Sequence, residues 1–361
     1  MTNDLPRRPR VIGGLEVLRR RGDEIQIGLD PRHAVVAGGL PAPVVAAVQR
    51  LTGRRTVDDL LTEVADPHGR AALVALLREL TARGLVTDAP PEPLVGRLAA
   101  DASTAEVRGT EHPSSRRELS VLVHGEGRLA VSVACLLTAA GVGWVHVLAA
   151  GAVRPEDTGT GYLADDVGRR RRAAATDAVA RVDPTTRTTT FRGAALPDLV
   201  LLTDALVPVP DQVSLLTARA VPHLSVRVRD GVGIVGPLVL PGLTSCLRCA
   251  DLHRCARDGC WPQLAAQLAG RPQLADLACT QATAALAASQ ALDALRYLRH
   301  EQDRPVTWNA SVELDPAKAA IRHRGWPAHP QCPCGAAPRV REVAAEERGE
   351  LRESWCDGDA S

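Results

Sequence analysis

A strand, a glycine turn, a helix and a second strand follow one another between residues 118 and 150, and this order constrains the fold most. The mostly apolar run 119–123 predicts a buried strand, and Gly125-Glu126-Gly127 comes directly after it. An apolar helix is expected over about residues 129–140, and a further strand over 144–148. This order predicts a βαβ unit and therefore an α/β fold.

The two glycines make this unit a candidate nucleotide site. Gly125 and Gly127 would let the backbone approach phosphates at the N-terminus of the following helix. The third glycine position of the usual fingerprint carries Ala130, which weakens the pattern. A βαβ unit that binds no ligand is the alternative interpretation.

Composition restricts the classes of protein. A chain of 361 residues is expected to hold two domains, and its 45% hydrophobic but 2% aromatic content predicts a core of Leu, Val and Ala. The formal net charge of +1 argues against binding of nucleic acid through bulk charge. No apolar run approaches the length of a membrane span, and no signal peptide is recognised, so a cytoplasmic protein without membrane contact is expected.

The first 88 residues predict a small, winged-helix-like α+β domain. Two short strands are expected within residues 24–36, and a strand begins at Leu85. Thr56 is the expected N-cap of a helix with acids in its first turn. Between the strands the apolar spacing predicts three helices, over residues 41–51, 57–64 and 68–82. Residues 89–118 are rich in Pro, Ala, Ser and charge and are interpreted as a linker.

The pattern TVDDLLTEV followed by LVALLRELTARGLV resembles PqqD-like recognition domains. That resemblance implies that the leader of a modified-peptide precursor adds a strand to the edge of the hairpin and packs against a helix. A DNA-binding winged helix is the alternative. Its helix over residues 57–64 carries Asp58, Asp59 and Glu63, which would repel phosphates.

The second half predicts an open, mostly parallel sheet with helices between its strands. Expected strands lie at residues 198–203, 223–228, 232–240, 305–313 and 321–324, and expected helices at 173–182, 211–220, 261–268 and 282–298. The first of these strands leads to Asp204. Residues 340–361 are charged and are interpreted as a flexible tail.

Two close cysteine pairs predict a structural zinc site. Cys246 and Cys249 form a C-x-x-C knuckle, and Cys332 and Cys334 form a second pair that would complete a tetrahedral set of four thiolates. Further candidate ligands near the knuckle rank lower because they fall on the following helical stretch; they are His253, Cys255 and Cys260. Free thiols are the alternative for each cysteine.

Residues 119–335 resemble the ubiquitin-activating-enzyme-like superfamily of ThiF and MoeB type. The segments that carry the resemblance are VLVHGEGRLAVSVACLLTAAGVGWVHVL, DDVGRRRRAAATDAVARVDP, VPHLSVRVRDGVGIVGPLVLPGLTSCLRC and the final CPC. Within the superfamily, SCLRCADLHR and WPQLAAQL resemble the ThiF-like partner proteins of azoline-forming cyclodehydratases. This resemblance implies a Rossmann-like, zinc-holding domain over residues 119–339.

An active adenylating member of the superfamily needs charged groups that this chain lacks. Ala149 and Gly151 stand at the positions of the acids that follow the second strand, and Thr160 stands where an arginine is usual. Arg171, within the run 169–172, takes the position of the phosphate-binding lysine. Arg128 replaces a loop glycine, and Asp204 matches the acid that binds Mg²⁺. The Arg run is either a surface for a partner or an acidic peptide, or a solvated helix start.

Two functions follow from the resemblance. The first is a non-catalytic, homodimeric scaffold that binds a leader peptide and docks a YcaO cyclodehydratase, which forms thiazolines or oxazolines with ATP. The alternative is an adenylyltransferase that activates a carboxylate with ATP and Mg²⁺ at Gly125, Gly127, Arg171 and Asp204.

Overall fold

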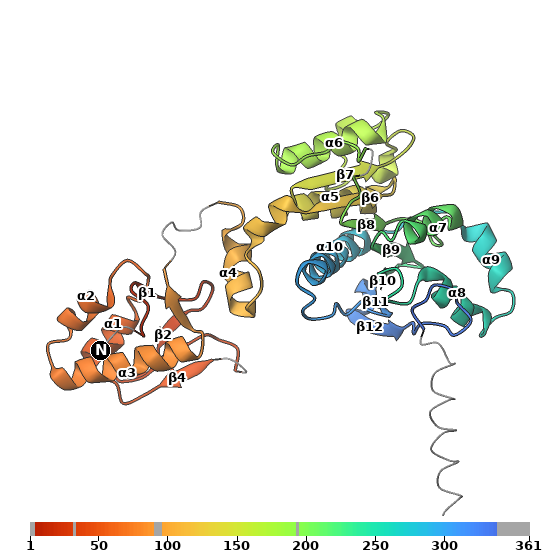
Figure 1. Cartoon of the computed structure of the whole chain (residues 1–361). Coiled ribbons are helices and arrows are strands. Elements are labelled where there is room, and N and C mark those ends of the chain that lie inside the picture. Colours follow the sequence, from red (N-terminus) through yellow and green to blue (C-terminus); the bar gives the residue numbers. More distant parts are fainter. Residues whose placement is uncertain (1–3, 32–33, 90–95, 193–194, 338–361) are drawn as a thin grey trace, which may run out of the picture. The chain divides into compact units, whose positions relative to one another are not determined.

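The fold is described from a computed structural model, which covers residues 4–31, 34–89, 96–192 and 195–337 (Figure 1). The chain divides into two compact units, residues 1–115 and 116–361. The tail expected over residues 340–361 lies outside the described residues. No helix in the described ranges is both long enough and apolar enough to cross a membrane.

The first unit combines two small antiparallel sheets with four helices. Its strands are β1 (Pro9–Val11), β2 (Val17–Arg19), β3 (Ile25–Ile27), β4 (Val35–Ala37) and β5 (Val86–Asp88). Strand β1 pairs with β5, and the other three strands have the order β2-β3-β4. The helices are α1 (Ala42–Val48), α2 (Val57–Glu63), α3 (Pro67–Ala82) and α4 (Ala99–Arg108).

Helices α1, α2 and α3 begin within one residue of the predicted positions. Thr56 caps α2 because its side chain accepts from the Asp59 N–H, and the Asp59 carboxylate accepts from the Thr56 N–H in return. Buried Leu60, Leu73 and Leu77 join the core that the helices share with β3. Helix α4 lies within the stretch interpreted as a linker and belongs to the first unit, where the carboxylate of Glu106 binds Arg10.

The second unit is built on one seven-stranded sheet in the order β12-β11-β10-β9-β8-β6-β7 (Figure 1). Its strands are β6 (Ser120–His124), β7 (Trp144–Leu148), β8 (Leu199–Leu202), β9 (His223–Arg229), β10 (Val232–Val239), β11 (Ala310–Asp315) and β12 (Ala320–Gly325). Strands β7, β6, β8 and β9 are parallel, as expected of a Rossmann-like sheet. The α/β fold class is therefore confirmed.

Helices cover both faces of this sheet. They are α5 (Arg128–Ala139), α6 (Arg171–Val182), α7 (Pro210–Ala218), α8 (Leu247–Cys255), α9 (Trp261–Leu268) and α10 (Leu277–His300). Helices α5, α6 and α10 share the main core with one face, which presents Val121, Leu199 and Val226. Helix α7 packs on the other face, where Val200 and Leu202 are buried. Successive residues of a strand therefore pack into the two different helix layers, and both faces of the sheet are buried.

Two expectations about this sheet are wrong. It is mixed rather than mostly parallel, because β9, β10, β11 and β12 are antiparallel neighbours. Asp230 and Gly231 both have positive φ, 52° and 76°, and form a tight hairpin between β9 and β10. The strand expected over residues 305–313 begins only at Ala310, because Asn309 has a φ of 50° that interrupts extended backbone.

Candidate functional site

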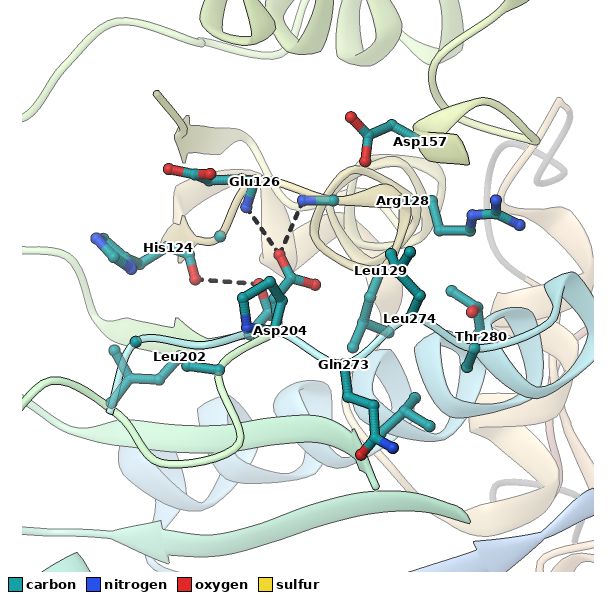
Figure 2. Close-up of a pocket in the computed structure, with 18 of the residues that line it drawn as sticks. His124, Glu126, Arg128, Leu129, Asp157, Leu202, Asp204, Gln273, Leu274 and Thr280 are labelled. Atoms are coloured by element: carbon teal, nitrogen blue, oxygen red, sulfur yellow. Dashed lines mark hydrogen bonds between the residues drawn. The ribbon is translucent and has the colours of Figure 1, made fainter. Parts of the chain in front are cut away.

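The glycine turn, the end of β8 and the start of α6 surround one cavity of about 470 Å³ (Figure 2). All four residues proposed from the sequence to bind a nucleotide line it: Gly125, Gly127, Arg171 and Asp204. They meet because β6 and β8 are parallel neighbours and both end at this edge. The carboxyl ends of parallel strands are the usual place for a ligand in such sheets.

Gly125 is required by close packing. A Cβ atom added there would lie 1.8 Å from the Thr203 hydroxyl and 2.7 Å from a carboxylate oxygen of Asp204. A Cβ at Gly127 would meet Asp204 only at ordinary contact distance, 3.6 Å. Gly125 therefore allows the turn to pack closely against the end of β8, and Gly127 is the N-cap residue of helix α5.

Asp204 occupies the backbone donors of the glycine turn. Its carboxylate accepts from the N–H groups of Glu126 and Gly127 at 2.7 and 2.9 Å (Figure 2). These are the groups that a bound phosphate would use. Burial raises the pKa of Asp204, and the negative charges of Asp157 and Glu126 act in the same direction, against the two N–H donors.

Arg171 is buried and already holds two acids. Its guanidinium donates to the carboxylate of buried Asp157 at 2.7 Å and to that of Glu126 at 3.2 Å. Burial alone would lower the pKa of Arg171, but the hydrogen bond and charge of Asp157 raise it. The described neighbours therefore neutralise the cation at the lysine-equivalent position.

The rest of the Arg run is also engaged. Arg169 forms ion pairs with Asp166 and Asp177, and Arg172 donates to the hydroxyl of Thr190. Arg169, Arg170 and Arg172 are nevertheless exposed, as the interpretation of a solvated helix start expects, and within the run only Arg171 is buried. Helix α6 begins within the run, and this beginning turns Arg171 inward.

Arg128 lines the cavity, but its guanidinium donates to the carbonyl oxygen of Glu156. Glu156 and Arg154 complete the charged lining, which holds three arginines and four acids. Thr160, at the position expected for a phosphate-binding arginine, is exposed and contacts the hydroxyl of Ser132. A lining that is richer in acids than in free cations suits a triphosphate poorly.

Sequence reasoning missed several residues of this cavity, including His124, Gln273 and Thr280. Burial lowers the pKa of His124, which keeps its imidazole neutral near pH 7. His124 ends β6 directly before the glycine turn, so its position was a usable signal. Gln273 and Thr280 come from about 150 residues further along the chain, and no local pattern marks them.

The four cysteines predicted to bind zinc lie together. Their Sγ atoms are all within 4.8 Å of one another, and the Cys246–Cys332 and Cys249–Cys334 pairs are 3.5 and 3.6 Å apart. Four thiolates at such distances suit a tetrahedral structural zinc ion. Burial raises the pKa of Cys332 to about 11, so a bound ion must displace its proton.

The other candidate ligands stay apart from this cluster. The Nε2 atom of His253 contacts the carbonyl oxygen of Pro327 at 2.9 Å, and Cys260 is exposed. Cys255 ends helix α8 and is half-buried. Among the described residues, only the four predicted cysteines form a group that could hold a metal ion.

No protein-family profile matches the chain, and no curated protein matches its sequence. Its fold is similar to solved structures. The structure of Escherichia coli MccB with MccA has a TM-score of 0.67 at 12% identity, covering 91% of this chain and 99% of that chain. MccB with ATP gives 0.65 at 12% identity, with 90% and 99% covered.

The structure of PaaA has a TM-score of 0.62 at 17% identity, and 86% of this chain and 98% of PaaA are covered. Because these similarities extend over nearly the whole chain, the protein has the same fold as MccB and PaaA. This agrees with the Rossmann-like, ThiF/MoeB-type fold expected from the sequence.

Proposed function

We propose that this protein is a non-catalytic scaffold that binds a ribosomal precursor peptide and presents it to a YcaO cyclodehydratase for thiazoline or oxazoline formation. The similarity to MccB supports the peptide partner, because MccB was crystallised with MccA and is described as a microcin C7 biosynthetic enzyme. The scaffold acts as a homodimer, and a structural zinc ion in each chain ties the Cys332–Cys334 segment to helix α8 of the same chain.

The occupation of the glycine turn by a carboxylate of the protein itself is the observation that supports the non-catalytic role. The carboxylate of Asp204 takes the two N–H donors of the glycine turn, and Arg171 is committed to Asp157. An ATP phosphate would have to displace one carboxylate and approach another. Loss of free donors and cations at a phosphate site costs several kcal/mol of transition-state stabilisation, about 3 for each donor.

The first unit supports the peptide-binding role. Strand β4 is an edge strand, because the described residues add no further strand beyond it. On one side of β3, the Arg20 N–H donates to the Glu24 carbonyl, and the Gly28 N–H donates to the Glu16 carbonyl. Residues 24, 26 and 28 therefore direct their backbone groups toward β2. Antiparallel alternation then directs the N–H and C=O of Val36 toward the open edge.

A leader peptide can pair with this edge in the manner of β-augmentation. The side chain of Val36 is 48% exposed and offers the added strand an apolar neighbour. The winged-helix-like interpretation of the unit, which the expected order of hairpin, helices and strand suggested, belongs to this proposal.

An ATP-dependent adenylyltransferase that activates a carboxylate is the second candidate. It is favoured by the MccB structures with ATP and with AMPCPP. In this reading Asp204 would leave the glycine turn and bind Mg²⁺, and the freed N–H groups would receive a phosphate.

ATP–pyrophosphate exchange separates the two functions. The scaffold predicts that the full chain binds a leader peptide and forms a complex with the YcaO protein but shows no exchange. The adenylyltransferase predicts exchange that requires Asp204 and Arg171. Exchange above the background of an Asp204→Ala, Arg171→Ala double variant would therefore refute the scaffold.

A further inference from the structure

A second cavity, of about 560 Å³, lies next to the first within the same unit, and Gln273 lines both. It is bounded by β9, the helices α8 and α9, and the strands β11 and β12. Its lining holds five arginines, three acids and two tryptophans. Neither the fold nor the proposed scaffold role accounts for this concentration of arginine.

Arg227 is the most unusual of these side chains. It sits on β9, a central strand, and is only 7% exposed. Its Nη1 atom donates to the hydroxyl of Ser225 at 3.0 Å, and no carboxylate in the described part of the chain pairs with it. Burial and the charges of Arg254 and Arg229 lower the pKa of Arg227 to about 9.

An arginine stays charged at neutral pH, and the charges of Asp251 and Glu313 offset the effect of burial on Arg227 only in part, without a direct ion pair to either acid. A buried charge that lacks a partner is costly, and proteins keep such groups mostly where a ligand supplies the partner. The free N–H groups of a guanidinium match the two oxygens of a carboxylate.

The two tryptophans form the apolar wall of the cavity. The guanidinium of Arg254 lies 5.0 Å from the ring centre of Trp261 and 4.5 Å from that of Trp326. Arg254 is also paired with Asp251 at 2.8 Å, so its charge is already satisfied. The indole N–H groups are fixed as well, to Asp251 and to Ser311. Trp326 is only 4% exposed, so of the two rings the partly exposed Trp261 is the one that can offer a fixed surface to an apolar group.

The acids in the lining limit the charge that the cavity can accept. Glu313 pairs with Arg324, and Asp230 is held by Gln273. These carboxylates would repel a triphosphate, whereas a single carboxylate adds one negative charge beside Arg227. The aromatic wall fits the chain that carries such a group, and the volume suits a few residues of peptide.

We propose that this cavity binds an acidic side chain of the precursor peptide, with the carboxylate on Arg227 and the adjoining peptide against Trp261. The inference rests on the proposed peptide-binding function and adds a second contact, outside the first unit, that selects an acidic residue. It requires neither nucleotide nor YcaO protein.

The test measures calorimetric binding of a capped pentapeptide with two glutamates to the full-length protein. A matched pentapeptide carries glutamines instead, and inorganic phosphate and ATP are titrated separately. We expect the glutamate peptide to bind about 10- to 100-fold more tightly than the glutamine peptide, as for a charge-assisted hydrogen bond. Arg227→Gln should remove this preference. Arg322→Gln should retain it, because Arg322 is exposed on β12 and does not line the cavity.

Equal binding of the two peptides to the wild-type protein would overturn the proposal without relying on any variant. So would tighter Arg227-dependent binding of phosphate or ATP than of the glutamate peptide. Because these peptides contain no leader, a Val36→Pro variant should bind them normally. If the wild-type protein bound no leader peptide but kept its preference for the glutamate peptide, the scaffold would be refuted and this site would stand.

Discussion

The carboxylate of Asp204 lies 2.9 Å from the backbone nitrogen of Gly127, a residue 77 positions earlier in the chain. This contact joins the end of β8 to the first turn of α5. It places a negative charge at a helix N-terminus, which favours that charge, but in an enclosed environment that disfavours it. The pH dependence of the unfolding free energy reports the balance between these two effects on the Asp204 carboxylate.

Asp204 should make stability depend on pH. The folded-state pKa is raised above 3.8, so the folded protein holds this proton more tightly than the unfolded chain. The stabilisation from Asp204 is complete at low pH and is lost as pH rises through the folded-state pKa. The unfolding free energy of the wild type relative to Asp204→Asn should therefore fall as the pH rises above about 4.

Urea unfolding followed by tryptophan fluorescence measures this difference, because all five tryptophans lie in the second unit. Asp165→Asn, at an exposed acid, is the control and should run parallel to the wild type. A difference between wild type and Asp204→Asn that stays constant with pH would contradict the expectation.

Breaking the buried pair of Arg171 and Asp157 should destabilise the second unit. Arg171→Ala leaves the Asp157 carboxylate buried without its main partner, which costs about 3–5 kcal/mol. Urea unfolding of this variant gives the cost. Adding Asp157→Asn to it should recover part of the loss, since no buried charge then remains. A double variant less stable than Arg171→Ala would show that the pair is not the source.

Metal analysis tests the cysteine cluster. The purified protein should hold about one zinc ion per chain, and Cys249→Ser should lose it and melt at a lower temperature. Cys135→Ser is the control, because Cys135 lies on α5 away from the cluster. Retention of zinc by Cys249→Ser would disprove the four-thiolate site.

Leader binding should depend on the outward N–H of Val36. Val36→Pro deletes this donor while leaving the pairing of β4 with β3 through residues 35 and 37, so leader affinity should fall by about tenfold. Val36→Thr keeps the backbone donor and should bind nearly as the wild type does. Fluorescence anisotropy of a labelled leader peptide measures both. Unchanged affinity of the proline variant would exclude β4 as the binding edge.

Much of the local structure could be predicted from the sequence. The sequence located β7 at its observed bounds and a helical region beginning at Trp261, and Thr56 marked the start of α2. These features depend on residues within one or two turns of each other, which is the range over which periodicity and capping act. The pairing of Cys246 and Cys249 was also visible, because a knuckle is a local motif.

The expected strand over residues 305–313 failed for a local reason that periodicity does not report. Its first residues include β-branched and aromatic types, which favour extended backbone, but Asn309 adopts positive φ. The direction of β10, β11 and β12 was missed for a different reason. Parallel and antiparallel strands have similar side-chain patterns, and the hairpin at Asp230 and Gly231 sets only the direction of β10 relative to β9.

The sequence by itself determined the elements, their order and the residue types available at the glycine turn and the cysteine pairs. The tertiary structure alone decided which charges meet. It placed Asp204 on the glycine turn, turned Arg171 toward Asp157, and left Arg227 buried with no ion pair to an acid of the described residues. Electrostatic partnership depends on distance in space and on local burial, and neither can be obtained from spacing along the chain.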